Sequence, residues 1–425
     1  METDKILQFA LFHKLPESHQ AWLLSLTQTY PFSHQQLKML IEYSADLICW
    51  NEGTLAQFHH PESVGKARGK QAAVKVFHEI RTGYETLKNN QKRYAADGGF
   101  SAAEQKFPEN QMVEVTLKGE IMGQCPVASE KTRCCNLKTL DAVQQCGFDC
   151  SYCSIQSFYH GNQVRFIENL VEHLEGLELD KEKRYHIGTG QSSDSLMWGN
   201  RFGLLESLYG FAAKNPNVVL EMKSKSARID YYIENPPPAN MVFTWSLNTP
   251  VVIRHEEKGT ASLDKRLESA RKLADQGIPV GFHFHPMVWY EGWREDYLNI
   301  VSRLTTLFKP EEVVMVSLGT LTFIKPVLKR IRERMPQSSI LQMPMEEIAG
   351  KYSYPLSIKE EIFSTLYTGF PDAWKESVFF YMCMEHIDLW KPVFGREYPS
   401  NEAFEADMID TYVQKLSRIK KASDA

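Results

Sequence analysis

Six runs of apolar and β-branched residues, separated by helical stretches, constrain the fold of this chain more than any other feature. The candidate strands are residues 137–145, 184–190, 217–224, 241–248, 278–285 and 311–319. The stretch ASLDKRLESARKLADQG between the fourth and fifth runs is amphipathic, and its Gly277 is typical of a helix C-terminus. Strands that alternate with helices form right-handed βαβ units and a parallel sheet. We expect an open doubly wound sheet or an incomplete barrel, with the chemistry at the carboxyl ends of the strands.

The N-terminal region has a different pattern, because it reads as mostly helical. Apolar residues recur there at helical spacing, and Ser33 is a typical N-cap for the second helical stretch. We therefore predict a helical N-terminal extension over residues 1–110. A barrel domain with C-terminal substrate-binding elements follows over residues 111–395, and a C-terminal helix and tail over residues 396–425.

Residues 65–94 form a basic segment within the predicted extension. The segment carries eight Lys or Arg residues against two Glu. A basic helix can face phosphate groups. A solvated helix face is the stronger interpretation, because no recognised nucleic-acid motif accompanies the charges.

Composition limits the setting of the protein. The net charge of −5 gives no general attraction to nucleic acid, and no apolar run reaches the roughly 18 residues of a membrane span. The first residues lack the basic-then-apolar order of a secretion signal, so we expect a cytoplasmic protein without a membrane partner. Eight cysteines in 425 residues are too sparse for a disulfide scaffold. Cysteines that cluster are therefore expected to bind metal or to be catalytic.

Three cysteines do cluster, at the end of the first predicted strand. Cys146, Cys150 and Cys153 form the pattern C-x3-C-x2-C, which leaves a tetrahedral zinc site or a four-iron cluster one ligand short. One interpretation is a structural zinc ion whose fourth ligand is Cys125, Cys134 or Cys135. The other is an iron–sulfur cluster with one iron open to a small-molecule chelate.

The cysteine pattern, with the aromatic Tyr152 before its last cysteine, resembles the radical S-adenosylmethionine superfamily. This resemblance implies an α/β fold with a partial (β/α)6 TIM-type barrel. It implies a [4Fe-4S] cluster on Cys146, Cys150 and Cys153, whose open iron is chelated by the amine and carboxylate of S-adenosylmethionine. The pair of cofactors would generate a 5′-deoxyadenosyl radical, while the protein positions them and excludes water.

A narrower resemblance covers roughly residues 120 to 395 and is to the spore photoproduct lyase family of DNA repair enzymes. The stretch WSLNTPVVIRHEEKGTASLDKRLESARKLADQGIPVGFHFHPMVWYEGWREDY follows that family's pattern in order and spacing, and GTGQSSDS and EMKSKS are similar to two of its strand-end segments. The resemblance implies that Ser193, Lys225 and Ser246 hold the methionyl and ribose parts of the cofactor. A lysine at a strand end can reach a carboxylate, although a solvated surface lysine is the alternative for Lys225.

The sequence departs from the family at two positions. The family has a hydrogen-donating cysteine where this chain has Gln191, and a tyrosine where this chain has Ser154. Tyr152 remains as a candidate catalytic residue. Cys383 is a second candidate, because it is the only cysteine in the last third of the chain, although a buried small hydrophobic residue is the stronger interpretation.

Two further groups are candidate ligand contacts. His283 and His285 alternate along a strand, but no carboxylate or cysteine lies within metal-motif spacing, so we favour structural or substrate-facing histidines. Lys351, Tyr352 and Tyr354 alternate as in a hairpin, and the family resemblance implies a basic, aromatic hairpin that enters DNA. Aromatic wedges beside phosphate-binding lysines suit the extrusion of a damaged base step.

The function that these observations predict is a radical S-adenosylmethionine lyase that repairs a thymine dimer or a related pyrimidine lesion. Damaged DNA would be the substrate, and a flavodoxin or ferredoxin the external electron donor. Two alternatives stay open. One is a radical enzyme that acts on RNA or a small metabolite, and the other is a non-catalytic, zinc-dependent nucleic-acid-binding protein. A descendant that keeps the cluster but is inert is a weaker third.

Overall fold

The computed structural model describes residues 3–95, 98–99, 111–125, 131–158, 163–334, 336–348 and 350–423. The chain divides into two compact units. Unit 1 contains residues 1–96 and 322–354, and unit 2 contains residues 97–321 and 355–425. Residues 322–354 thus group with the N-terminal helices, whereas the boundaries at residues 110 and 395 stay a prediction.

An eight-stranded sheet forms the centre of unit 2. In spatial order its strands are β16 (Phe379–Met382), β12 (Val313–Thr320), β11 (Val280–Met287), β9 (Met241–Leu247), β8 (Val218–Ser224), β7 (Tyr185–Gly188), β3 (Lys138–Leu140) and β2 (Met122–Gln124). Only the edge pair β2–β3 is antiparallel. Each of the six predicted runs overlaps one strand of this sheet, whereas β2 and β16 were not predicted.

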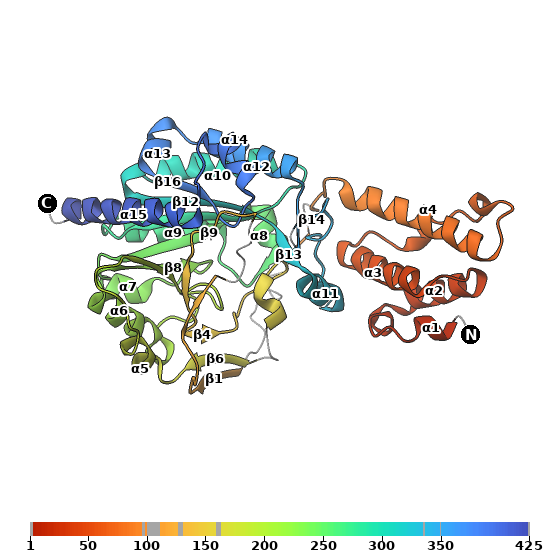
Figure 1. Cartoon of the computed structure of the whole chain (residues 1–425), viewed down its shortest axis with the longest axis horizontal. Helices are drawn as coiled ribbons and strands as arrows, with labels where there is room; N and C mark the ends of the chain where they lie inside the picture. The colour runs from red at the N-terminus through yellow and green to blue at the C-terminus, as the bar shows by residue number, and fades with distance from the viewer. Residues whose placement is uncertain are drawn as a thin grey trace. The chain divides into compact units, whose positions relative to one another are not determined.

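The order of the strands decides between the two expected architectures. The parallel strands follow one another across the sheet in chain order, without the reversal that defines a doubly wound sheet. The sheet is open at β16 and β2 and curls into a half-barrel, as Figure 1 shows. The predicted partial barrel is therefore confirmed.

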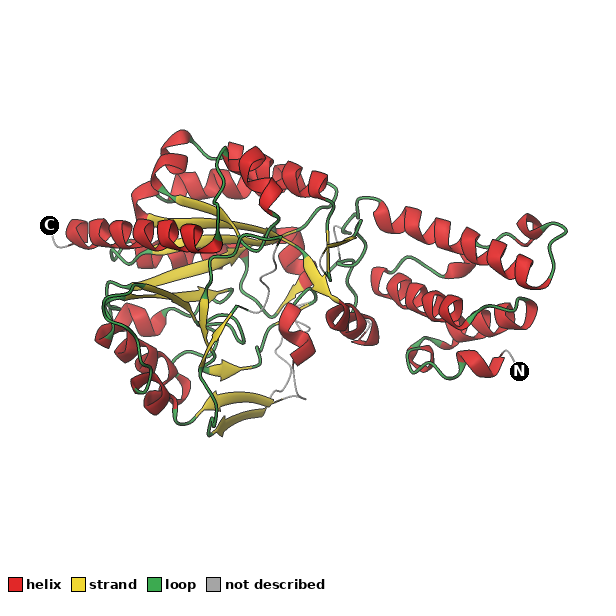
Figure 2. Cartoon of the chain, in the orientation of Figure 1, coloured by secondary structure: helices red, strands yellow, loops and turns green. Residues whose placement is uncertain are grey.

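Helices cover the sheet, as Figure 2 shows. They are α5 (Leu170–Glu175), α6 (Leu204–Lys214), α7 (Asp230–Glu234), α8 (Pro250–Glu256), α9 (Leu263–Ala274), α10 (Trp293–Leu307), α12 (Leu356–Gly369), α13 (Asp372–Ser377), α14 (Trp390–Phe394) and α15 (Asn401–Ser423), with short 3-10 turns η4 (Ser154–Phe158), η5 (Arg201–Gly203), η6 (Pro310–Glu312) and η7 (Ile387–Leu389). Every residue of β9 and β12 is buried, as expected for parallel strands covered on both faces. Among the described residues, no helix is long and apolar enough to span a membrane.

Helix α15 packs against the amino-terminal side of the sheet. The Lys415 ammonium donates hydrogen bonds to the carbonyls of Pro310 (2.6 Å) and Ser377 (2.9 Å), which precede β12 and β16. The ring of Tyr412 lies 5.3 Å from that of His186 on β7. The helix therefore covers the end of the half-barrel opposite the strand carboxyl ends.

Two small sheets complete unit 2. In the first, β6 (Gln163–Ile167) pairs with β1 (Gln111–Val115) and β4 (Val143–Gln144). In the second, β5 (Asp149–Cys150) pairs with β10 (Glu257–Lys258) in antiparallel register. The second sheet fixes the position of the cysteine motif, because Cys150 lies opposite Glu257.

Unit 1 is mostly helical. Its elements are α1 (Thr3–Ile6), η1 (Phe12–Lys14), α2 (Glu17–Thr29), α3 (His34–Trp50), η2 (Leu55–Phe58), η3 (Pro61–Val64), α4 (Gly69–Asn89), β13 (Thr322–Ile324), α11 (Lys325–Arg334), β14 (Glu346–Ile348) and β15 (Lys351–Ser353). Ser33 caps α3 as predicted, since its hydroxyl accepts a hydrogen bond from the Gln36 amide. The buried Asp46 carboxylate accepts hydrogen bonds from Tyr84 on α4 (2.6 Å) and Arg332 on α11 (2.8 and 2.9 Å). This polar cluster ties the later segment to the N-terminal helices.

Candidate active site

The cysteine motif lies on a loop that is bound to the segment after β9. Besides the β5–β10 pairing, the Ser151 amide donates a hydrogen bond to the Glu256 carbonyl (2.9 Å), and its hydroxyl donates one to the Glu256 carboxylate. The Gln156 side chain donates hydrogen bonds back to two carbonyls of the loop, those of Ser151 (3.1 Å) and Cys153 (2.8 Å). Backbone and side-chain contacts therefore hold the part of the loop that carries Cys150 and Cys153.

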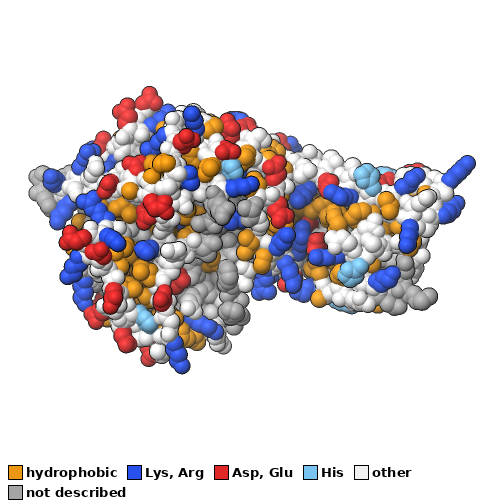
Figure 3. Space-filling model, in the orientation of Figure 1, with side chains coloured by type: hydrophobic (Ala, Val, Ile, Leu, Met, Phe, Trp, Pro, Cys, Tyr) orange, Lys and Arg blue, Asp and Glu red, His pale blue; other side chains and the backbone are white. Residues whose placement is uncertain are grey.

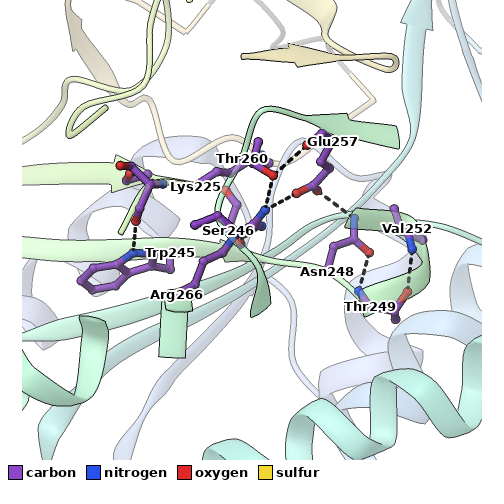
Figure 4. A network of polar contacts seen from close by, with 12 residues as sticks. Lys225, Trp245, Ser246, Asn248, Thr249, Val252, Glu257, Thr260 and Arg266 are labelled. Atoms are coloured by element: carbon purple, nitrogen blue, oxygen red, sulfur yellow. Dashed lines mark hydrogen bonds and ion pairs between the residues drawn. The ribbon is translucent and has the colours of Figure 1, made fainter. Parts of the chain in front are cut away.

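A buried ion pair lies directly beneath this loop. The Arg266 guanidinium donates hydrogen bonds to the Glu257 carboxylate (2.5 Å), the Ser246 carbonyl (2.7 Å) and the Thr260 hydroxyl (2.7 Å), as Figure 4 shows. The Tyr152 hydroxyl donates a hydrogen bond to the other oxygen of the Glu257 carboxylate. Through Glu257, the tyrosine of the cysteine motif is thus anchored to β9 and α9.

The pKa of Glu257 reflects this environment. Burial alone would raise the pKa, but the Arg266 guanidinium and the Lys225 ammonium outweigh burial, with help from the hydrogen bonds of Tyr152 and Arg266. The pKa is therefore lowered from its ordinary value. The carboxylate stays ionised and can hold both partners.

Asn248 connects the same carboxylate to β11. Its amide nitrogen donates to Glu257 (3.3 Å) and to the Pro286 carbonyl (3.0 Å), and its amide oxygen accepts from the Tyr297 hydroxyl (2.8 Å). Figure 4 shows Asn248 between Glu257 and Thr249. The residues of the WSLN and GTASLDKR segments therefore support the cysteine loop from below.

Gly147 allows the loop to approach the segment after β7. A Cβ atom at this position would lie 2.4 Å from the Met197 methyl group and 2.7 Å from the Trp198 ring. The Gly147 amide donates to the Met197 sulfur (3.4 Å), and that sulfur lies 3.7 Å from the Cys146 thiol. A side chain at position 147 would therefore displace Met197 or Trp198, and only glycine fits there.

Cys150 is buried, and Cys146 and Cys153 are partly buried. Burial, with the charges of Asp194 and Cys153, raises the pKa of Cys146 to about 12. Burial also raises the pKa of Cys150 well above its ordinary value, and the Lys225 ammonium opposes this shift. Thiols with such raised pKa values lose their protons at neutral pH only when a cation, such as a bound metal ion, stabilises the thiolate form.

The donor set fits an iron–sulfur cluster. Three soft thiolate ligands lie on one loop, all at least partly buried and one short of four. Among the described residues, no three His, Cys, Asp or Glu side chains converge on one point as in a mononuclear metal site. A four-iron cluster does not need such convergence, because each cysteine binds a different iron.

Lys225 lies beside the cysteine loop. Its ammonium is 5.8 Å from the centre of the Tyr152 ring. Its amide donates a hydrogen bond to the Asp194 carboxylate (2.6 Å), which also accepts from the Ser224 hydroxyl (2.8 Å) and from the amides of Leu196 and Met197. Asp194 therefore locks the loop after β7 onto the end of β8, next to Lys225, whose contact with a cofactor carboxylate stays a prediction.

The two predicted serine ligands occupy neighbouring strand ends. Ser193 lies in the loop after β7, and its hydroxyl accepts a hydrogen bond from the Trp198 indole (2.9 Å). Ser246 lies on β9, where its carbonyl accepts from Arg266, and both serines are buried. The structure thus brings Ser193, Lys225 and Ser246 to consecutive strands, while their roles stay a prediction.

His283 belongs to a buried polar cluster inside the half-barrel. Its imidazole contacts the Glu221 carboxylate (2.6 Å) and the Ser317 hydroxyl (2.6 Å), and His186 contacts the other Glu221 oxygen (2.8 Å). Burial and the Lys223 ammonium lower the pKa of His283 to about 4, against the opposing effect of Glu221. A structural role accounts for His283. His285 lies on the same face of β11, and burial lowers its pKa well below the ordinary value.

Cys383 follows β16 at the carboxyl end of the sheet. Its amide donates a hydrogen bond to the Leu318 carbonyl (2.7 Å). Burial raises the pKa of its thiol, the Lys223 ammonium lowers it, and the Cys125 and Cys134 thiols raise it further. Cys383 is therefore a protonated thiol within a group of cysteines, and it lies near Lys223, a partly buried lysine of β8.

The predicted hairpin is present in unit 1. Strand β15 pairs with β13 and β14, the Tyr352 hydroxyl donates to Glu347 (2.6 Å), and the Lys325 ammonium lies 5.9 Å from the Tyr352 ring. Lys351 and Tyr352 are partly exposed, whereas Tyr354 is completely buried. The burial of Tyr354 does not favour its predicted role as a substrate contact.

Sequence reasoning missed the residues that hold the site together. Asp194, Glu257 and Arg266 lie within the segments that carried the family resemblance. Asp194 and Glu257 have partners in other segments, whereas Arg266 pairs with Glu257 of its own segment. Acidic residues next to a Ser-rich loop and an Arg four residues after a Ser N-cap were the available signals. Neither signal shows which residue is the hydrogen-bond or ion-pair partner, because that depends on the three-dimensional structure.

A family model described as Spore photoproduct lyase matches residues 140–368. Spore photoproduct lyase of Bacillus subtilis is 30% identical over 169 residues, which cover 36% of this chain and 49% of that protein. The enzyme of Clostridium acetobutylicum is 24% identical over 222 residues, which cover 51% of this chain and 64% of that protein. The chain thus spans about half to two thirds of the length of these curated relatives.

Solved structures support the fold. A spore photoproduct lyase complexed with dinucleoside spore photoproduct aligns with a TM-score of 0.55 at 20% identity and covers 64% of this chain and 82% of its own. A mutant of spore photoproduct lyase aligns with a TM-score of 0.56 at 18% identity and covers 76% of this chain and 96% of its own. At this identity the likeness concerns the fold alone.

Proposed function

Since this chain belongs to the spore photoproduct lyase family, we propose that it is a radical S-adenosylmethionine lyase that repairs a thymine dimer or a related pyrimidine lesion in DNA. The observation that supports this proposal is the cysteine loop, which carries one buried and two partly buried thiols, lies beside Lys225 and is anchored through Glu257 to Arg266. This arrangement supports a cluster that keeps one iron for a chelating ligand.

Cys146, Cys150 and Cys153 would hold the cluster. When bound, the cluster and S-adenosylmethionine supply a 5′-deoxyadenosyl radical that abstracts hydrogen from the substrate. The Lys225 ammonium is proposed to bind the cofactor carboxylate, and the hydroxyls of Ser193 and Ser246 its neighbouring polar groups. The hydrogen bond from Tyr152 to Glu257 keeps the loop in place and the site closed to water.

Cys383 is proposed to return the hydrogen atom. Gln191 occupies the position of the family's donor cysteine, and an amide N–H is a poor hydrogen-atom donor. Homolysis of the Cys383 S–H bond would transfer hydrogen to the substrate carbon radical and leave a thiyl radical. One electron from a flavodoxin or ferredoxin and one proton would then restore the thiol. The raised pKa of Cys383 supports this role, because only the protonated thiol carries the hydrogen.

Gln191 also favours a second candidate function. If the reaction does not need the cysteine that donates a hydrogen atom in the family, the same radical chemistry could act on an RNA or a small metabolite. This candidate shares the cluster and the cofactor site and differs only in the substrate.

The test is an anaerobic assay of the reconstituted protein with reductant, S-adenosylmethionine and irradiated DNA. We expect 5′-deoxyadenosine together with restored thymines. Cofactor cleavage without repair would reject the DNA lesion and favour the second candidate. Zinc bound by four side chains, without sulfide, would reject the radical enzyme altogether.

A further inference from the structure

Unit 1 is basic although the chain as a whole is acidic. It contains 17 Lys and Arg against 12 Asp and Glu, whereas the whole chain contains 48 against 53. Unit 1 therefore carries a formal charge of +5, and unit 2 carries −10. Figure 3 shows Lys and Arg side chains gathered over the end of unit 1 where α4 begins. An anionic polymer would be attracted to unit 1 and repelled by much of unit 2.

The excess charge is concentrated where α4 begins. Lys66, Arg68, Lys70 and Lys75 are all exposed, and we name these four residues the basic patch. In the part of the chain that the structure describes, Lys66, Lys70 and Lys75 make no hydrogen bond or ion pair. Arg68 donates only to the carbonyls of Gly65 (3.3 Å) and Ala67 (2.9 Å). Within the described ranges of the chain, no carboxylate pairs with the patch.

Two acidic residues of α4 are already engaged, whereas Glu62 on η3 is exposed and forms no ion pair with the basic patch among the described residues. Glu79 accepts a hydrogen bond from Ser63 (2.9 Å) and lies 3.5 Å from the His59 imidazole. Glu85 pairs with Arg81 (2.7 Å) one turn later on α4. These are the two Glu residues of the segment 65–94, and neither is paired with a residue of the basic patch among the described residues.

The position of the patch is unfavourable for the helix itself. The first turn of α4 has no acidic residue, and the N-cap Arg68 makes no side-chain capping bond. Cations near a helix N-terminus oppose the helix dipole, and most helices place acidic residues there. Local rules of this kind are broken mainly at functional sites, where a ligand compensates for the cost.

We propose that the basic patch binds the phosphate backbone of duplex DNA. This inference rests on the proposed function, which makes DNA the partner. Duplex DNA carries one negative charge for about every 1.7 Å of its axis, so four cations within ten residues can meet several phosphates at once. Such contacts hold the duplex without reading its sequence, as suits a repair enzyme whose lesions occur in any context.

The experiment measures the affinity of the full chain, without cofactors, for an undamaged fluorescein-labelled duplex at several salt concentrations. The variant carries Lys66→Gln, Lys70→Gln and Lys75→Gln. If all three lysines contact phosphates, the slope of log K against log salt falls by about 2.7, and binding at 0.1 M salt weakens by up to about 500-fold. Circular dichroism verifies that α4 remains folded.

The matched control removes the same charge from unit 2 through Lys181→Gln, Lys183→Gln and Lys214→Gln, all at exposed positions. We expect this control to bind at least as tightly as the wild type. Equal slopes for the two triple variants would overturn the inference. So would a patch variant that loses binding to phosphatidylserine vesicles but keeps its affinity for the duplex.

The outcomes separate this inference from the proposed function. Patch-dependent binding by a chain that repairs nothing would contradict the proposed function alone. If the chain repairs a dinucleotide lesion but the patch variant binds the duplex as tightly as the wild type, this inference alone is contradicted.

Discussion

Replacement of Arg266 by leucine is expected to destabilise unit 2 strongly, because it leaves the Glu257 carboxylate buried without its cation. The two side chains are 0% and 1% exposed and lie 2.5 Å apart. Removal of one partner of a buried ion pair costs about 3 to 5 kcal/mol. The Ser246 and Ala261 carbonyls also lose their donor in the Arg266→Leu variant. We expect the upper part of that range.

The size of the loss depends on pH in a direction that can be worked out. In the wild type the pKa of Glu257 is lowered from 4.5, so its contribution to stability is present above pH 4.5 and is lost as pH falls through the folded pKa. Without Arg266, burial is opposed by the Lys225 ammonium and by the hydrogen bonds from Tyr152 and Asn248, and the folded pKa rises. The ionised carboxylate then destabilises the variant at pH 8, and protonation relieves part of this penalty at pH 5.

The assay is urea denaturation at pH 5 and pH 8, with hydrogen exchange of β9 peptides to follow unit 2 separately from unit 1. The control is Arg303→Leu, which breaks an exposed pair with Asp264 (2.6 Å) and should cost less than about 1 kcal/mol. A loss for Arg266→Leu no larger than the control, or equal at both pH values, would refute the reasoning.

Three further predictions concern the loop and the half-barrel. Gly147→Ala places a methyl group 2.4 Å from Met197, so we expect a loss of about 1 to 3 kcal/mol in thermal denaturation, and an unchanged melting temperature would contradict the packing argument. Cys150→Ala should remove iron–sulfur absorption after reconstitution while Cys49→Ala retains it, and equal spectra would reject the ligand assignment. The pKa of His283 is lowered to about 4, so its imidazole should stay neutral between pH 5 and 8 in NMR titrations, and the free energy of unfolding should fall as pH drops from 6.5 toward 4. A titration near pH 6.5 would contradict the burial argument.

The sequence predicted the architecture of unit 2 well because its signals are local. Long buried runs such as β9 and β12 contain mostly apolar residues, and strand-to-helix alternation is visible without a partner. Strand β16 was missed, because four residues before a cysteine give too short a pattern. The grouping of residues 322–354 with unit 1 depends on Arg332 reaching Asp46 across 286 positions, which no local pattern encodes.

The candidate site divides in the same way. The cysteine spacing and the Lys225 position are readable from the chain, because motif residues are close in sequence or lie at strand ends. The contacts that support the site cannot be read from the chain. Tyr152 is hydrogen-bonded to Glu257, which is 105 positions away, and Asp194 to Lys225, which is 31 positions away. The same limit applies to Tyr354, whose aromatic pattern gave no sign of its complete burial.

The most direct test of the central claim is the electron paramagnetic resonance spectrum of the reduced, reconstituted protein before and after addition of S-adenosylmethionine. If three cysteines leave one iron open, the cofactor must bind that iron, and we expect the cluster signal to shift. A cluster signal that the cofactor leaves unchanged, or iron atoms that are all bound by protein side chains, would contradict the account.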